Sequence, residues 1–419
     1  MEAKQKIIVV GGGFAGINLV KKLDDKLFDI TLIDKINHHQ FQPLFYQVAT
    51  SQIEPSSISF PLRHIFRKKR NIQIRLAEVL KVNTSANSIT TSTGEYEYDY
   101  LVLALGCQSN FFGNKKIAEN ALTLKTTYDA ISIRNHILQT FEDIISANES
   151  EKNSLLNLVI VGAGPTGVEL AGAFAEIKKN ILPKDFPGID FSRFRIILVE
   201  GSKYTLNNMS DSSKKASYKY LQKMGVQILT ETLVTDYDGE TLYLNNESII
   251  KTKNLIWTAG VKANTVEGIP EAWLTAGNRI KVDRMNKIIG SDNIFIVGDM
   301  ALMTTPKYPK GHPQLANVAI NQAKNLAKNL KRIHLGQKPV DYEYKDLGTM
   351  ATIGRNKAVV DLPYIRFQGM FAWMVWMFLH LMLILSVRNK LIIFINWAWA
   401  YISKDTSLRL ILKSTNQNN

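Results

Sequence analysis

The sequence predicts an α/β protein made of two copies of one module, followed by a helical C-terminal segment. The chain has 419 residues, a length typical of two or three domains. An apolar run of four residues leads into a glycine-rich hexapeptide and then a helix-like pattern, and this order occurs twice, about 150 residues apart. From residue 367 onward, apolar runs rich in tryptophan replace the mixed composition of the first part. These features favour two parallel-stranded modules and a tail of different character.

The composition is that of a folded globular protein, because 45% of the residues are hydrophobic and 21% are charged. A mean hydropathy of −0.07 excludes a polytopic membrane protein, although it leaves room for one short membrane-active segment. The net charge of +14 and a pI of about 9.5 indicate an anionic partner: a membrane surface, a nucleic acid or a phosphate-bearing ligand. We expect no secretory signal or transit segment, since the first apolar run begins at Ile7 without a charged leader.

The first module begins with Ile7–Val10, a uniformly apolar run typical of a buried parallel strand. A G-x-G-x-x-G pattern follows, and Ile17–Lys22 then has the pattern of a helix start. One glycine makes the tight turn, one lets a pyrophosphate approach the backbone, and one lets the helix pack on the strand. The second apolar run ends in an acid placed to bind a ribose. The pattern predicts a Rossmann-like module with ligand contacts at Gly11, Gly13, Gly16 and Asp34.

The second module begins with the apolar run Leu158–Val161, which is again followed by a G-x-G-x-x-G pattern and a helix start. Its second strand, Arg195–Val199, ends in Glu200, whose carboxylate would accept hydrogen bonds from a 2′-hydroxyl and repel a 2′-phosphate. We therefore expect a preference for NADH over NADPH. The intervening Lys178–Phe194, which contains two prolines, is predicted to be a surface insertion. The glycines of this copy are Gly162, Gly164 and Gly167.

Two further apolar runs support a duplication. Tyr98–Gly106 and Leu255–Gly260 are both strand-like, both end in a small residue and a glycine, and lie about 150 residues apart, as the two glycine patterns do. A third such run, Ile294–Val297, is followed by Gly298 and Asp299. An aspartate at the carboxyl end of a strand can contact a ribityl chain or a pyrophosphate, directly or through water.

These motifs resemble those of the two-dinucleotide-binding flavoprotein reductases and, more narrowly, the type II NADH:quinone oxidoreductases. The narrower resemblance depends on Phe41–Thr50, Ser109–Gly113 and the tryptophan-rich C-terminus, and it extends from about Lys6 to Leu412. It implies an α/β fold with two Rossmann-like domains, for FAD and NADH, and a C-terminal helical membrane-binding segment. The implied domains are an FAD-binding domain over 1–125 and 278–350, an NADH-binding domain over 126–277, and a membrane-anchoring region over 351–419.

The resemblance assigns cofactor contacts to residues that match the family's motifs. For FAD these are Gly11, Gly13, Phe14, Ala15, Gly16, Asp34, Lys35, Gln47, Ala49, Thr50, Ala104, Gly106 and Asp299. For NADH they are Gly162, Gly164, Pro165, Thr166, Gly167, Glu200, Ala259 and Gly260.

The resemblance also implies a set of residues near the reacting groups. Glu169 matches the family's acidic residue near nicotinamide and flavin, although an acid in the first turn of a helix is also favoured by the helix dipole. The family's glutamine-rich stretch corresponds to 316–322, where Asn317 and Asn321 replace the usual glutamines and Gln322 retains one. The two asparagines are four residues apart and would share a helix face. Both are candidates for contact with a quinone.

The single cysteine, Cys107, restricts the electron acceptor. Disulfide reductases of this class need a redox-active cysteine pair, and sulfide:quinone oxidoreductases also use cysteines. One cysteine excludes the first chemistry and disfavours the second, so we expect Cys107 to serve packing. The seven histidines show no metal-ligand spacing, and no metal site is predicted.

The tail contains two apolar runs, Phe367–Val387 and Leu391–Ser403. Length permits a single membrane span, two helices lying in the interface, or buried packing against the reductase core. We favour interfacial helices, because tryptophans beside basic residues suit the lipid headgroup zone. The basic run Arg63–Arg70 could touch the same surface or form a solvated helix end, and no nucleic-acid-binding module is present. The basic residues available to anionic headgroups are Arg388, Lys390, Lys404, Arg409 and Lys413.

The function implied is FAD-dependent oxidation of NADH with two-electron reduction of a membrane quinone, without proton pumping. The alternatives are a reductase with a protein acceptor such as ferredoxin, and a flavin sensor that binds NADH without turnover. The resemblance implies monotopic attachment to the cytoplasmic face of a bacterial inner membrane. The family is often dimeric, and the sequence neither shows nor denies a homodimer.

Overall fold

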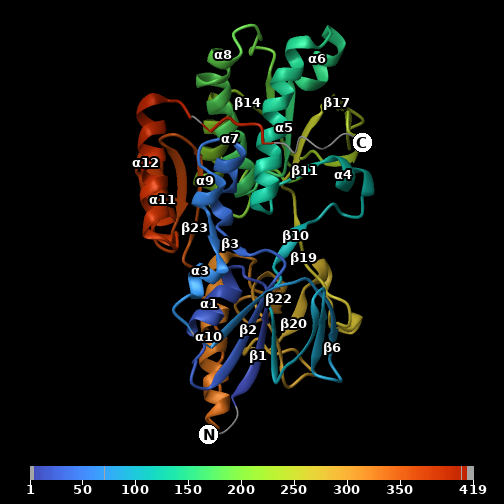
Figure 1. The fold of residues 1–419 in the computed structure, drawn as a ribbon. Coiled ribbons are helices and arrows are strands. Elements are labelled where there is room, and N and C mark those ends of the chain that lie inside the picture. Colours follow the sequence, from blue (N-terminus) through green and yellow to red (C-terminus); the bar gives the residue numbers. More distant parts are fainter. Residues whose placement is uncertain (1–3, 70, 407, 413–419) are drawn as a thin grey trace. The chain divides into compact units, whose positions relative to one another are not determined.

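The computed structural model describes residues 4–69, 71–406 and 408–412, which form two compact units (Figure 1). Unit 1 comprises the described residues of 1–40, 60–108 and 261–345. Unit 2 comprises those of 41–59, 109–260 and 346–419. Arg70 and Lys413, named above for their charge, lie outside the described residues.

Unit 1 contains a five-stranded parallel sheet in the order β21-β9-β1-β2-β5. The first strand carries the glycine pattern at its carboxyl end and sits in the middle of the sheet, as a uniformly apolar strand should. The strands are β1 (Gln5–Val10), β2 (Phe28–Asp34), β5 (Ile72–Leu76), β9 (Tyr100–Leu103) and β21 (Ile294–Ile296).

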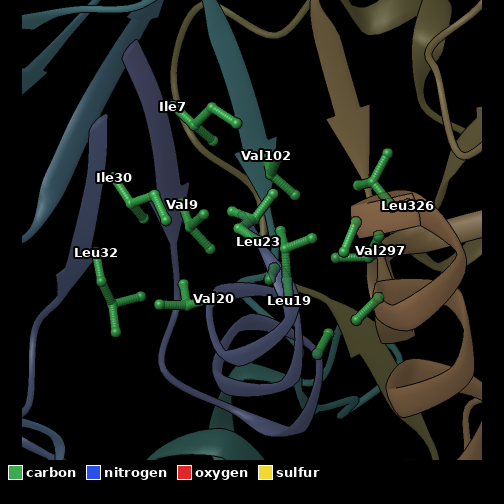
Figure 2. Close-up of a cluster of buried hydrophobic side chains, with 14 of the residues drawn as sticks. Ile7, Val9, Leu19, Val20, Leu23, Ile30, Leu32, Val102, Val297 and Leu326 are labelled. Atoms are coloured by element: carbon green, nitrogen blue, oxygen red, sulfur yellow. The ribbon is translucent and has the colours of Figure 1, made fainter. Parts of the chain in front are cut away.

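Alternate side chains of Ile7–Val10 in β1 enter two different cores, which explains why these four positions are all apolar. Ile7 and Val9 pack against α1 (Phe14–Lys22) and α10 (Ala316–His334), whereas Ile8 and Val10 face the other side of the sheet. Figure 2 shows the first of these cores, with side chains from the sheet and both helices pointing toward one another. Its labelled members are Ile7, Val9, Leu19, Val20, Leu23, Ile30, Leu32, Val102, Val297 and Leu326.

Smaller elements complete unit 1. A three-stranded antiparallel sheet and a short parallel pair lie outside the main sheet. The chain passes between the units after residues 40, 59, 108, 260 and 345, and two short strands, β10 (Cys107–Ser109) and β19 (Val261–Ala263), lie at two of these boundaries. The remaining elements are β3 (His38–Gln40), α3 (Leu62–Phe66), β6 (Val79–Asn83), β7 (Ser88–Thr91), β8 (Gly94–Glu97), β20 (Ile280–Val282) and β22 (Ala301–Met303), with β4 (Ser59–Pro61) at a unit boundary.

Unit 2 contains a second parallel sheet, in the order β11-β18-β12-β13-β14, and four of its strands repeat the topology of unit 1. The edge strand differs, because β21 is the last strand of its sheet in the chain and β11 is the first of its own. The strand before the glycines is central in both sheets, with the acid-bearing strand on one side and the small-residue strand on the other. This shared order confirms the predicted duplication. The strands are β11 (Leu122–Thr123), β12 (Asn157–Val161), β13 (Arg195–Val199), β14 (Val226–Leu229) and β18 (Asn254–Trp257).

The predicted surface insertion, Lys178–Phe194, is wrong in part. Helix α7 (Pro165–Asn180) continues into its beginning, and Leu182 and Phe194 are buried. Phe194 packs edge-on against Phe141 of α5 (Thr127–Ser146), with 5.2 Å between ring centroids, so apolar side chains fix the segment to the unit. Other elements here are α4 (Lys115–Asn120), α6 (Glu149–Leu155), α8 (Leu182–Asp185), α9 (Asp211–Lys223), β15 (Val234–Tyr237), β16 (Thr241–Leu244) and β17 (Ile249–Lys251).

The C-terminal part of unit 2 consists of a three-stranded antiparallel sheet and two helices, which lie side by side in red in Figure 1. The two apolar runs form separate helices because the chain is extended at Ile384 and Ser386, which end one helix and begin the next. Within the described part of the chain, no helix is long and apolar enough to cross a membrane. The elements are β23 (Thr349–Gly354), β24 (Lys357–Asp361), β25 (Arg366–Gln368), α11 (Met370–Leu383) and α12 (Val387–Ser403).

Candidate functional site

The first glycine turn connects β1 to α1 and is too tight for larger residues. A Cβ on Gly11, whose φ is +107°, would lie 2.4 Å from the Ala104 carbonyl oxygen, and one on Gly16 would lie 1.8 Å from the Gly11 oxygen. Gly13 is exposed, and a Cβ there would meet nothing within 4 Å. The turn therefore packs against the sheet on one side and leaves its backbone open to a phosphate on the other.

The acid at the end of β2 holds this turn in place. The Asp34 carboxylate accepts hydrogen bonds from the backbone N–H groups of Gly12 and of Ile36, the latter at 2.8 Å. Burial raises the pKa of Asp34. Lys35, the next residue, is exposed. Phe14 and Ala15 begin α1, and Ala15 is buried in the core, so its contribution to a ligand would come from its backbone.

A second group of predicted residues surrounds the carboxyl end of β21. Asp299 lies in a short turn after that strand, and its carboxylate accepts a hydrogen bond from the Cys107 thiol at 3.0 Å. The prediction that Cys107 serves packing alone is therefore incomplete. Gln322, on α10, is fully buried, and its Oε1 accepts the Gly298 N–H at 2.9 Å. Gln322 thus fixes the backbone next to Asp299.

The two asparagines of the predicted quinone stretch lie in the first turns of α10, as expected. Asn317 has a buried amide oxygen without a hydrogen-bond partner among the described residues. Asn321 is half-buried. Gly106 is open, with φ of +69° and no atom within 4 Å of a Cβ built there. All these residues belong to unit 1.

The second glycine turn, in unit 2, has the same construction as the first. A Cβ on Gly162 would lie 2.8 Å from the Ala259 Cα, and one on Gly167 would lie 1.9 Å from the Gly162 oxygen. Three residues of the turn are exposed, and these form the face that a phosphate would meet: Gly164, Pro165 and Thr166. Gly260 is also crowded, because a Cβ there would lie 2.8 Å from the Phe112 ring.

Glu200 holds the second turn as Asp34 holds the first. Its carboxylate accepts the Ala163 N–H at 2.6 Å and the Ser202 N–H at 2.7 Å. Two turns of the same shape, each held by an acid from the neighbouring strand, are thus present, one in each unit. Turns of this kind at a helix N-terminus can bind pyrophosphate groups.

Unit 2 also contains a cavity of about 90 Å³. Its walls come from the segment containing α2 (Phe45–Ala49), from α7, from the β23–β24 hairpin, and from α11 and α12. The lining combines five aromatic side chains with two carboxylates and one guanidinium. It includes Tyr46, Gln47, Glu169, Glu176, Thr352, Arg355, Trp373, Trp376, Trp397 and Tyr401.

Two carboxylates of α7 face this cavity, seven residues apart and so on one face of the helix. Burial raises the pKa of Glu169 to about 8, although the Thr352 N–H and the Trp376 indole oppose the shift. Burial also raises the pKa of Glu176, whose carboxylate accepts the Arg355 N–H. A group with a pKa near 8 can both hold and release a proton near neutral pH, which suits proton transfer.

A hydrogen-bonded chain crosses from α12 to α2 beside the carboxylates. The Trp397 indole N–H donates to Gln47 Oε1 at 2.8 Å, and Gln47 Nε2 donates to the Tyr46 hydroxyl at 2.8 Å. Thr50 Oγ1 donates to the Tyr46 carbonyl at 2.7 Å, and Ala49 is buried. Gln47, Ala49 and Thr50 were predicted from the resemblance.

Several cavity residues escaped prediction. Trp376 and Trp397 were interpreted as headgroup-facing residues, yet they are 1% and 8% exposed and face inward. The spacing of Asn389, Ile393 and Trp397 by four residues is a helix stripe that contains a polar Asn, and it could have revealed the inward face. Glu176 could have been found by its spacing from Glu169. Arg409 is also not free for lipid, because it pairs with Asp185 at 2.5 Å.

The fold and the paired dinucleotide turns define the class of two-nucleotide reductases, and comparison with known proteins supports this. The family model for pyridine nucleotide-disulphide oxidoreductases matches residues 5–323, and that for the NDH2 C-terminal domain matches residues 347–404. The structure resembles NDH2 from Plasmodium falciparum with a TM-score of 0.90 at 22% identity, covering 98% of this chain and 100% of that one. It also resembles a sulfide:quinone oxidoreductase from Aquifex aeolicus, with a TM-score of 0.74 at 20% identity, covering 96% of each chain.

Similar sequences are more specific. The chain is 34% identical to the type II NADH:quinone oxidoreductase Ndh of Mycobacterium tuberculosis, over 96% of this chain and 89% of that protein. It is 28% identical to a type II NADH:quinone oxidoreductase of Staphylococcus aureus, over 85% of this chain and 89% of that protein. The chain belongs to the type II NADH:quinone oxidoreductase family.

Proposed function

We propose that this enzyme oxidises NADH through FAD and reduces a membrane quinone, without pumping protons. The overall reaction balances as NADH + quinone + H⁺ → NAD⁺ + quinol. The observation that carries this proposal is the aromatic cavity of unit 2, which is walled partly by the two apolar C-terminal helices and lined by two carboxylates. A flat, apolar and proton-accepting molecule fits such a lining. With one cysteine, the chain has no intramolecular dithiol to accept electrons instead.

The residues of unit 1 fit FAD. The first turn offers open backbone at Gly13, and Asp34, which holds the turn, would bind the ribose. Asp299, whose orientation is set by Cys107 and by the Gln322 bond to Gly298, would hold the ribityl-diphosphate part. Bound FAD would supply hydride acceptance and electron transfer. We assign FAD to a domain over 1–125 and 278–350, with contacts as the family resemblance gives them.

The second turn and Glu200 would hold NADH, in a domain over 126–277. Both oxygens of the Glu200 carboxylate accept backbone N–H groups, so its charge is fixed where the 2′-phosphate of NADPH would come. We propose that NADH is therefore the better substrate.

The quinone would enter the cavity lined by Glu169 and Tyr46. Net proton uptake needs a group that exchanges protons with solvent, and the raised pKa of Glu169 suits that task. We propose that Gln322 acts as a positioning residue and that Asn317 and Asn321 contact the cofactor or the acceptor. The asparagine side chains are one methylene shorter than the glutamines usual in the family, so their amides reach less far.

The region 351–419 would attach the protein to a membrane surface, with the outer faces of α11 and α12 in the lipid. Large apolar side chains on these faces are exposed, among them Phe371, Phe378, Leu391, Phe394, Ile395, Trp399 and Ile402. We place the protein on the cytoplasmic face of a bacterial inner membrane. The family resemblance also leads us to expect a homodimer, which sedimentation in detergent tests.

Steady-state NADH oxidation by the purified full-length protein tests the proposal. We expect flavin absorbance, reduction of menadione and ubiquinone by NADH, and a lower kcat/KM for NADPH than for NADH. Protein without flavin, or without quinone reduction, would overturn it. Activity with ferredoxin alone would favour a protein acceptor, and slow reoxidation by every quinone would favour a sensor.

A further inference from the structure

The hydroxyl of Tyr46 has a proton that nothing in the described part of the chain accepts. The side chain is 5% exposed and lines the cavity. Its oxygen accepts the Gln47 amide N–H at 2.8 Å, which leaves the O–H itself without an acceptor among the described residues. A buried hydroxyl that does not donate a hydrogen bond is unfavourable, so a ligand in the cavity that accepts this proton would be stabilised.

The direction of this O–H is set by Trp397. An indole N–H can only donate, so the Gln47 oxygen must face Trp397 and the Gln47 NH₂ must face Tyr46. Because the phenol oxygen is already an acceptor toward Gln47, its proton points away from Gln47. Helix α12 thereby fixes a hydrogen-bond donor on α2.

The phenol keeps its proton under working conditions. Burial, together with the nearby Glu169 carboxyl, holds the pKa of Tyr46 well above its usual value of 10. Glu169, which lines the same cavity, has a pKa of about 8 and is mostly protonated at pH 7, so it competes weakly for this donor.

We propose that the Tyr46 hydroxyl donates a hydrogen bond to a carbonyl oxygen of the quinone, and that Trp397 positions this donor through Gln47. The inference rests on the proposed function and deepens it. As two electrons enter the quinone, charge grows on its oxygens, and a fixed donor stabilises that charge. Tyr46 keeps its proton throughout, so the balance of the reaction is unchanged.

The first test is Tyr46→Phe, which keeps the ring and removes the hydroxyl. We expect kcat/KM for the quinone to fall about tenfold, the worth of one hydrogen bond. Anaerobic reduction of the flavin by NADH and the reduction of ferricyanide, which takes up no proton, should stay within about twofold of wild type. Tyr243→Phe removes the phenol of an exposed side chain on strand β16 and serves as the matched control.

The second test is Trp397→Phe, which frees the Gln47 amide to turn. We expect kcat/KM for the quinone to fall about threefold, which is less than for Tyr46→Phe. The double variant Tyr46→Phe/Trp397→Phe should have the same kcat/KM as Tyr46→Phe alone. Additive losses in the double variant would show that Trp397 acts only through packing and would overturn its positioning role. Quinone reduction unchanged in Tyr46→Phe would overturn the donor role.

The controls separate this inference from the proposed function. If wild type fails to reduce quinones, the proposed function fails. If wild type reduces them and Tyr46→Phe does so equally well, only this inference fails. Equal losses with quinone and ferricyanide would indicate general damage to the flavin site and would also overturn the donor role.

Discussion

At the scale of the residue, two carboxylates from different halves of the chain do the same work. Asp34 and Glu200 each accept a backbone N–H from the glycine turn of the neighbouring strand. Each turn also contains two glycines that no larger residue can replace and one, Gly13 or Gly164, that faces open space. The crowded glycines therefore serve the fold, and we propose that the open glycine serves the ligand.

The two kinds of glycine predict different outcomes. Gly167→Ala would place a methyl group against the Gly162 oxygen, so we expect unit 2 to lose about 1–3 kcal/mol of unfolding free energy, measured by denaturant titration. Gly164→Ala should leave stability unchanged and raise the KM for NADH about tenfold, because its methyl group meets only the ligand. Equal stabilities of the two variants would contradict this reading of the turn.

The pKa of Glu169 predicts a dependence of stability on pH. The folded protein holds the Glu169 proton up to a pH of about 8, whereas the unfolded chain releases it near the ordinary value of 4.5. Stability from this group is therefore full below pH 4.5 and is lost as the pH rises toward 8. Glu169→Gln should melt at a higher temperature than wild type at pH 9 and match it more closely at pH 5. A constant difference across this range in thermal melts would argue against a raised pKa.

At the scale of the element, α12 has two apolar faces of different use. Asn389, Ile393 and Trp397 form the inward stripe, and Asn389 donates to the Ser57 carbonyl at 2.9 Å. Phe394 and Ile395, which lie between Ile393 and Trp397 in the sequence, are each more than half exposed. The inward stripe binds α12 to the body of unit 2 and leaves the outer face exposed, as the proposed contact with lipid requires.

Glutamates on the outer face test this division. In a variant carrying Phe378→Glu and Ile395→Glu, we expect loss of most binding to lipid vesicles, measured by cosedimentation, because charges in the interface oppose insertion. Reduction of ferricyanide by NADH should persist, since both side chains point away from the body. Leu80→Glu, on the exposed strand β6, is the control and should bind as wild type does. Unchanged binding of the double variant would place the membrane surface elsewhere.

At the scale of the whole molecule, a +14 charge accompanies two modules that bind anionic nucleotides and a tail that we propose binds lipid. Arg388 and Lys404 are exposed at the two ends of α12, beside the apolar outer face. Arg409, in contrast, pairs with Asp185 and Asp405. Only part of the positive charge near the tail is thus free to meet headgroups.

The free charge predicts a salt-dependent membrane affinity. Binding to vesicles containing phosphatidylglycerol should weaken about tenfold between about 0.05 and 0.5 M NaCl, because screening shortens the reach of exposed charges. Binding to neutral phosphatidylcholine vesicles should be weaker and nearly independent of salt. Equal affinity for both kinds of vesicle would mean that apolar contact alone attaches the protein.

The sequence by itself determined the two dinucleotide modules, because their features are local. A central strand such as Ile7–Val10 must be apolar on both faces, and the turn after it needs glycines at set positions, so both can be read from neighbouring residues. The acids at the strand ends and the two separate apolar runs of the tail were predicted in the same way. The duplicated sheet order confirms the inference from spacing.

Only the tertiary structure decided the cavity. Tyr46, Glu169, Arg355 and Trp397 come from four segments distant in sequence, and no local pattern indicates that they share one lining. The same holds for the inward tryptophans: the composition of the tail is apolar all round, so the side that packs is set by the polar partners Gln47 and Ser57 rather than by hydrophobicity. Neighbouring residues determine local geometry, whereas a site assembled from distant segments forms only when the chain has folded.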